Sequence, residues 1–135
     1  MSNAGTEVLT INVRITGVNE VKGHTGTARM ILFDGTVDCD NFKGKILPGG
    51  VDTQKELGDE PTLLSARYIL EGTDKEGNPS HIFIENNGQF REGGENTTTP
   101  KVITDSQALA FLETADLYGT IEGIEGGVRI HIFEG

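Results

Sequence analysis

The sequence lacks tryptophan altogether and holds little cysteine, proline or basic charge. Its single cysteine, Cys39, excludes an intramolecular disulfide and agrees with a reducing compartment. Against 21 Asp and Glu there are only 11 Lys and Arg, and the net charge of -10 disfavours nucleic-acid backbones and anionic lipid surfaces as partners. No apolar run approaches the roughly 18 residues that span a bilayer. We therefore expect a cytoplasmic protein with no nucleic-acid or membrane partner.

The chain length and the high glycine content predict one small domain built of strands. A chain of 135 residues suits a single hydrophobic core. Its 19 glycines, together with the scarcity of helical spacing, indicate short strands joined by tight turns. The segment Met1-Ser2-Asn3-Ala4 resembles the remnant of an expression tag, so we assign residues 5–135 to a single domain.

Alternating apolar and polar residues predict the positions of the strands. We place them at 7–15, 27–33, 36–42, 45–47, 63–71, 81–87, 101–103, 118–123 and 128–133. The pair Asp34-Gly35 predicts a hairpin turn, and apolar spacing over 105–113 predicts one short helix near the C-terminus. About eight strands in hairpin order favour an all-β fold, a closed antiparallel barrel, because closure removes exposed strand edges.

The most distinctive stretch is Gly44-Lys45-Ile46-Leu47-Pro48-Gly49-Gly50-Val51-Asp52. Pro48 lacks an N–H, and the two glycines permit backbone angles closed to other residues. A strand therefore runs into a stiff corner and emerges on a carboxylate. We expect this corner to aim Asp52 and Gln54 at a site.

That stretch, with Ala66-Arg67-Tyr68 and Ile82-Phe83-Ile84-Glu85-Asn86-Asn87-Gly88, resembles the DUF3237 (UPF0311) family of bacterial proteins. The resemblance implies a small antiparallel β-barrel of about eight strands, and it implies no reaction. It singles out the residues that match the family pattern, Asp52, Arg67 and Asn86. Thr53 stands where many relatives carry an aromatic residue, so an aromatic ligand contact is not expected there.

The candidate site is a polar rim at the barrel mouth, formed by Asp52, Gln54, Arg67 and Asn86, which would bind a small molecule in an apolar lumen. Arg67 can grip an anionic or carbonyl ligand, or it can form a structural ion pair with Asp52 or Glu71. The strand period leaves open which face of 63–71 lines the interior. Tyr68, on the other face from Arg67, joins the site as a ligand contact in one of the two arrangements.

Two further classes of function remain open. In a cofactor-independent isomerase, cyclase or lyase, Asp52 would transfer a proton while Arg67 or Tyr68 stabilises negative charge. In an interaction module, apolar outer faces would assemble a homo-oligomer. We expect no metal and no cofactor, because His24, His81 and His131 lack paired ligand spacing. Cys39, between Asp38 and Asp40, is not expected to be a nucleophile.

Overall fold

The protein is all-β in this computed structural model, which describes residues 5–90 and 97–135. The strands, in chain order, are β1 (Thr6–Lys22), β2 (Thr27–Cys39), β3 (Phe42–Ile46), β4 (Val51–Glu56), β5 (Thr62–Asp74), β6 (Pro79–Phe90), β7 (Thr98–Thr104), β8 (Leu117–Ile124) and β9 (Gly127–Glu134). A short 3-10 turn, η1 (Ala110–Glu113), lies between β7 and β8. A search of the described residues finds no helix that is both long and apolar enough to cross a membrane.

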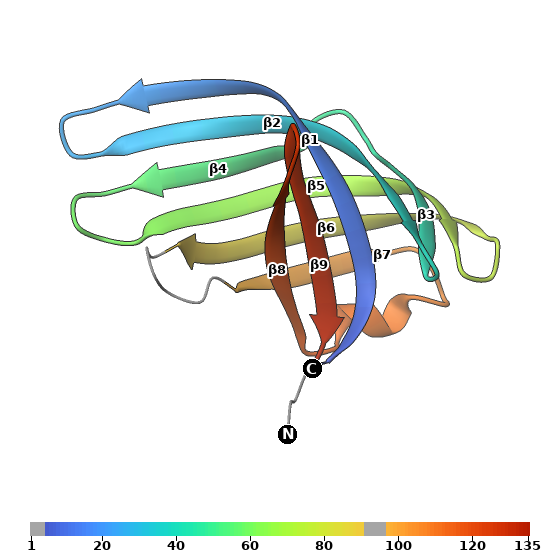
Figure 1. Ribbon diagram of the computed structural model, residues 1–135. Helices are drawn as coiled ribbons and strands as arrows, with labels where there is room; N and C mark the ends of the chain where they lie inside the picture. The colour runs from blue at the N-terminus through green and yellow to red at the C-terminus, as the bar shows by residue number, and fades with distance from the viewer. Residues whose placement is uncertain (1–4, 91–96) are drawn as a thin grey trace.

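Eight of the strands close into a ring in the order β1-β9-β8-β7-β6-β5-β3-β2, with β2 pairing back to β1. Every pair is antiparallel. Figure 1 shows the β8–β9 hairpin and the start of β1 crossing in front of the other strands. The prediction of a closed antiparallel barrel is thus confirmed, with a ninth strand added.

The ninth strand arises at the Pro-Gly-Gly corner. Both β3 and β4 pair with the same two neighbours, β2 and β5, so they form one strand interrupted at Leu47–Gly50. The Leu47 N–H donates to the carbonyl of Ile69 (2.8 Å), and the Phe33 N–H donates to the carbonyl of Gly50 (3.1 Å). Gly49 has a φ of 109°, which favours glycine. The corner therefore restarts the strand instead of ending the sheet.

The two ends of the barrel differ. Strand β9 pairs with β1 only as far as Arg14, and from Gly17 onward β1 pairs only with β2. The wall made by β1, β2, β4, β5 and β6 therefore extends past the β8–β9 hairpin (left in Figure 1). One end is covered by η1, and the other end flares open.

The hydrophobic core fills the closed end. Its largest apolar side chains, each less than 2% exposed, are Phe42, Leu9, Ile11, Leu70, Ile82, Ile84, Leu109, Leu112 and Ile132. Along β5, Leu64, Tyr68 and Leu70 face this interior, so the apolar face of that strand lines the barrel. Removing apolar surface from water is the dominant stabilising term, which explains why this face points inward.

Two local predictions were wrong. Asp34-Gly35 is not a turn, because β2 runs straight through it, and the chain reverses instead between Cys39 and Phe42. A side chain at position 35 would clash with the carbonyl of Asn12, so this glycine allows close strand approach. The helix expected over 105–113 is reduced to Ala110–Glu113. The Leu109 N–H donates to the Ser106 hydroxyl (3.1 Å), a hydrogen bond that fixes the turn just before η1.

Candidate functional site

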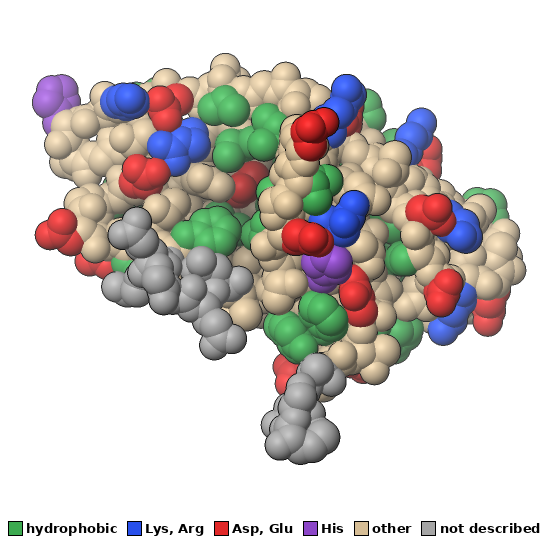
Figure 2. All heavy atoms as spheres, in the orientation of Figure 1, with side chains coloured by type: hydrophobic (Ala, Val, Ile, Leu, Met, Phe, Trp, Pro, Cys, Tyr) green, Lys and Arg blue, Asp and Glu red, His purple; other side chains and the backbone are tan. Residues whose placement is uncertain are grey.

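A cavity of about 260 Å³ lies inside the open end of the barrel. Its lining is mostly apolar and comes from seven strands: Val13, Ile15, Ile31, Phe33, Asp52, Gln54, Leu64, Ala66, Asn86, Phe90, Ile121, Val128 and Ile130. Figure 2 shows hydrophobic side chains at the surface beside the β8–β9 hairpin, where this recess opens. Only three lining residues are polar, and all three belong to the predicted site: Asp52, Gln54 and Asn86.

The sheet register explains why these residues meet. Asp52 is the cross-strand partner of Ala66, and Ala66 is the partner of Asn86, so the three form one row across β4, β5 and β6. Gln54 lies two residues after Asp52 and therefore points to the same side of the sheet. The small side chain of Ala66 leaves space between the carboxyl group and the amide.

Asp52 is only partly satisfied. Its Oδ2 accepts a hydrogen bond from Gln54 Nε2 (2.9 Å), whereas its Oδ1 is buried and has no partner among the described residues. Burial raises the pKa of this carboxyl group, although the hydrogen bond from Gln54 opposes the shift. A buried acceptor without a donor costs free energy, so the arrangement favours a molecule that supplies the donor.

Asn86 presents a second acceptor to the same cavity. The residue is 1% exposed, and its Oδ1 also lacks a partner among the residues that the structure describes. Buried amide oxygens in native proteins nearly always accept a hydrogen bond. Two unpaired acceptors therefore flank Ala66 inside an otherwise apolar space.

Tyr68 is buried in the core and does not line the cavity. Its ring packs edge-on against Phe33, with ring centroids 5.4 Å apart. Burial strongly raises the pKa of its hydroxyl group, which has no partner in the described part of the chain. The structure therefore places Tyr68 behind the cavity wall formed by Phe33.

The structure corrects the expectation that Arg67 shares a site with Asp52. Arg67 is the partner of Val51, on the outer face, and its side chain is 58% exposed. Its Nε donates to Glu85 Oε2 (3.3 Å). Because neighbouring residues of a strand face opposite sides, Arg67 and Ala66 cannot both point inward. The expected pairing with Glu71 is also wrong, since that carboxylate contacts His81.

Sequence reasoning missed the charged group at the rim. Arg29 lies across from Gln54 on the inner face of the flared wall. Its Nε donates to Glu20 (3.0 Å) and its Nη1 donates to Glu56 (2.7 Å). The alternation Arg29, Ile31, Phe33 carried the signal, because all three must share one face.

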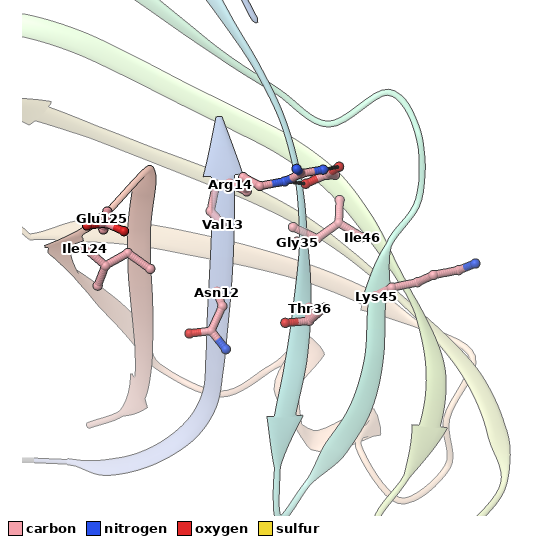
Figure 3. A pocket seen from close by; sticks show the side chains of 10 residues that line it. Asn12, Val13, Arg14, Gly35, Thr36, Lys45, Ile46, Ile124 and Glu125 are labelled. Atoms are coloured by element: carbon pink, nitrogen blue, oxygen red, sulfur yellow. Dashed lines mark hydrogen bonds and ion pairs between the residues drawn. The ribbon is translucent and has the colours of Figure 1, made fainter. Parts of the chain in front are cut away.

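A second hollow lies between β1, β2, β3 and the β8–β9 turn, and its lining includes several charged residues. Its volume is about 480 Å³, and Asn12, Arg14 and Thr36 are among its lining residues. Arg14 bonds both carboxylate oxygens of Asp34 (3.0 and 2.7 Å), and Figure 3 shows Lys45 pointing away from this pair. Arg14 and Asp34 are already paired with each other and both are exposed, so we do not assign this hollow as the site.

The histidines do not build a metal centre in the described residues, where no group of three or more His, Cys, Asp or Glu side chains is suitably placed. His81 lies between Asp105 (2.8 Å) and Glu71 (3.3 Å). His131 lies between Glu7 (2.7 Å) and Glu122 (2.9 Å). When protonated, each histidine therefore forms ion pairs with two carboxylates.

Comparison with solved structures gives the same fold. A protein with unknown function from Clostridium acetobutylicum has a TM-score of 0.80 at 25% identity, covering 95% of this chain and 96% of the other. A conserved protein of unknown function from Rhodopseudomonas palustris has a TM-score of 0.78 at 24% identity, covering 96% and 95%. A β-barrel-like protein from Acinetobacter baumannii has a TM-score of 0.77 at 18% identity, covering 96% and 94%.

Sequence comparison points to the same group of proteins. A UPF0311 protein of Clostridium acetobutylicum is 44% identical over 57 residues, which are 42% of this chain and 34% of that protein. The matched stretch thus spans about a third of the relative's length. The family model described as "Protein of unknown function (DUF3237)" matches residues 4–97, a stretch that includes the Pro-Gly-Gly corner and the three polar residues of the cavity. The chain therefore belongs to the DUF3237 family.

Proposed function

We propose that this protein binds a small, largely apolar molecule in the cavity at the open end of the barrel. The observation that carries the proposal is the pair of buried acceptors, Asp52 Oδ1 and Asn86 Oδ1, that lack donors in the described structure. Structural polar groups in a closed core normally satisfy one another. Groups that are left unpaired in an accessible apolar cavity are typical of ligand sites.

The volume limits the ligand. A cavity of about 260 Å³ is larger than the ~150 Å³ apolar cavities that take up benzene. It is smaller than the roughly 300–1,000 Å³ pockets that hold drug-sized molecules. The size therefore favours a molecule with one ring or a short branched chain, and with donor groups at one end.

Ligand-observed NMR with neutral, cationic and anionic monocyclic aromatic compounds at millimolar concentration tests the proposal. We expect some of these compounds to bind, and we expect Ala66→Leu to abolish binding because it fills the space between the acceptors. The matched control is Arg67→Leu, which adds the same side chain on the outer face. Val128→Phe, on the opposite wall, is the second blocking variant should Ala66→Leu fail to fold.

Binding of no compound by the wild type would overturn the proposal. It would also be overturned if the blocked variants, folded by circular dichroism, bound the compounds as the wild type does. Both results would mean that the cavity is not used.

A second candidate function is acid–base catalysis by Asp52, favoured by the raised pKa of its buried carboxyl group. Arg67 takes no part in it, because it lies on the outer face. The test follows each bound compound by NMR for chemical change over hours. Change that disappears in Asp52→Asn supports catalysis, and unchanged compounds leave binding as the function.

A further inference from the structure

The charges around the cavity bear on the kind of ligand that it takes. Asp52 is the one ionisable residue among the lining residues, and no Lys, Arg or His in the described chain joins it there. The nearest basic residue across the strand register, Arg29, is held by two carboxylates at the rim. A carboxylate in an apolar space without a cation is costly, and a ligand cation removes that cost.

The hydrogen-bonding pattern adds a second constraint. The cavity presents two unpaired oxygens, Asp52 Oδ1 and Asn86 Oδ1, on either side of Ala66. A hydroxyl group has a single donor and can satisfy one of them. A primary ammonium group has three donors in a compact head and can bond to more than one acceptor.

The apolar walls also suit a cation that carries a hydrophobic body. Phe33 and Phe90 supply aromatic rings to the lining, and the faces of such rings attract cations. The net charge of -10, with Glu20 and Glu56 at the rim, raises the local concentration of cations and repels anions. A divalent metal ion is a poor fit, because a metal-binding group of three side chains is missing from the described residues.

We infer that the cavity is a site for a small apolar primary amine, whose ammonium group bridges Asp52 and Asn86 above Ala66 while its hydrophobic part contacts Phe33 and the aliphatic wall. The inference rests on the proposed function, and it narrows the ligand class from small apolar molecules to cationic ones.

Three probes of matched shape test the inference by isothermal titration calorimetry on the full chain at pH 7: 2-phenylethylamine, 2-phenylethanol and phenylacetate. We expect the amine to bind about tenfold or more tightly than the alcohol, since hydrogen bonds to charged groups are stronger than neutral ones. Phenylacetate should bind most weakly. This ranking in the wild type needs no variant.

Two variants that remove one negative charge each locate the effect. Asp52→Asn should bring the affinities for amine and alcohol within about threefold of each other, because the charged partner is lost. Asp38→Asn removes the same charge from an exposed outer position and should keep the full preference for the amine. Asp52→Ser repeats the test if the Asn variant does not fold by circular dichroism.

The outcomes distinguish a preference for amines from ligand binding in general. Equal affinity of the wild type for the amine and the alcohol overturns the inference and leaves the proposed function standing. A preference for the amine that persists in both folded Asp52 variants assigns it to net charge, and this also overturns the inference. Binding of none of the three probes overturns the inference and counts against the proposed function as well.

Discussion

Two carboxylates near opposite ends of the barrel, one buried and one half-buried, show how the same side chain can serve structure or function. Asp74 ends β5 at the closed end and is 6% exposed. Its Oδ1 accepts the backbone N–H groups of Glu76 (2.9 Å) and Asn78 (3.0 Å). Its Oδ2 accepts the hydroxyl groups of Ser80 (3.2 Å) and Ser106 (2.6 Å). The Asp74 carboxylate is therefore fully satisfied.

Asp52, on β4 near the open end, has one oxygen bonded to Gln54 and the other without a partner in the described chain. The hydrogen bonds, led by that of Ser106, lower the pKa of Asp74, whereas burial raises the pKa of Asp52. The number of donors, more than the degree of burial, separates the two groups. The closed end uses its carboxylate to fix a turn and to hold the segment before η1, and the open end keeps a free acceptor.

The largest expected loss of stability comes from removing hydrogen bonds to Asp74 at the closed end. Ser106→Ala removes a donor to Asp74 and the acceptor of the Leu109 N–H, and we expect it to cost about 1–3 kcal/mol in free energy of unfolding. Asp74→Asn should cost more, because all four of its donors lose a charged acceptor. Urea denaturation at pH 7 measures both losses.

Acid titration checks the same group. A lowered pKa means that Asp74 stabilises the fold above the ordinary carboxyl pKa and loses this contribution as the pH falls through its folded value. The stability gap between wild type and Asp74→Asn should therefore narrow on acidification below about pH 4. A gap independent of pH would contradict the role of the charged carboxylate.

The next effect has the opposite sign and concerns the open end. Asp52→Asn should leave the free energy of unfolding at pH 7 within about 1 kcal/mol of the wild type, on the side of greater stability. A raised pKa means that ionised Asp52 opposes folding, so stability is lost as the pH rises through its folded value. Urea denaturation at pH 7 and at pH 3.5 should show the gain at pH 7 alone.

A clear loss of stability in Asp52→Asn at pH 7 would erase the contrast between the two ends. The control is Asp38→Asn, which removes an equal charge from an exposed position and should leave stability nearly unchanged.

A smaller effect on stability is expected from the ion pairs that join β9 to β8 and β1. His131 of β9 contacts Glu122 of β8 and Glu7 of β1, and these carboxylates, Glu122 most strongly, raise its pKa. A raised histidine pKa stabilises the fold fully below about 6.5 and loses this contribution as the pH rises through the folded value. We expect His131→Gln to cost about 0.5 kcal/mol at pH 6 and nothing at pH 8.5.

Thermal denaturation at the two pH values measures this difference. His81→Gln is the matched control, because His81 has the same two-carboxylate arrangement away from the β8–β9 hairpin. Ligand affinity can be measured in the same variant. Above pH 8 the ion pairs of His131 are already lost in the wild type, so a fall in the ligand affinity of His131→Gln at that pH would not come from these contacts.

Much of the fold follows from sequence periodicity, because alternation reports directly on which residues share a face. It fails where one residue type has two uses. Gly35 in Asp34-Gly35 permits close strand approach instead of a turn, and the sequence alone does not show the neighbouring Asn12 carbonyl. The helical spacing over 105–113 is realised only at Ala110–Glu113, and the turn before it is held by the bond from the Leu109 N–H to the buried Ser106 hydroxyl.

The candidate site was predictable only in part, for a geometric reason. Asp52, Gln54 and Asn86 are predicted because they follow a corner or match the family pattern, and the structure brings them to one cavity. Arg67 was misplaced because strand alternation leaves the inner face undetermined until burial is known. The apolar lining from β1, β8 and β9 was missed, since it comes from strands far apart in the chain that only ring closure brings together.

The smallest expected effect is at Arg67, and it tests whether the two faces of the wall are independent. The side chain makes one ion-pair contact, Nε to Glu85 Oε2 at 3.3 Å, and is more than half exposed. Exposed pairs of this kind contribute about 0–1 kcal/mol, so Arg67→Ala should shift the free energy of unfolding by at most about 0.5 kcal/mol. The affinities for 2-phenylethylamine and 2-phenylethanol should stay within twofold of the wild type, because no atom of Arg67 lines the cavity. Calorimetry measures these affinities beside those of Asp52→Asn. A loss of amine affinity in Arg67→Ala as large as that in Asp52→Asn would show that the outer face contributes to binding, and the distinction between a structural outer wall and a functional lumen would fail.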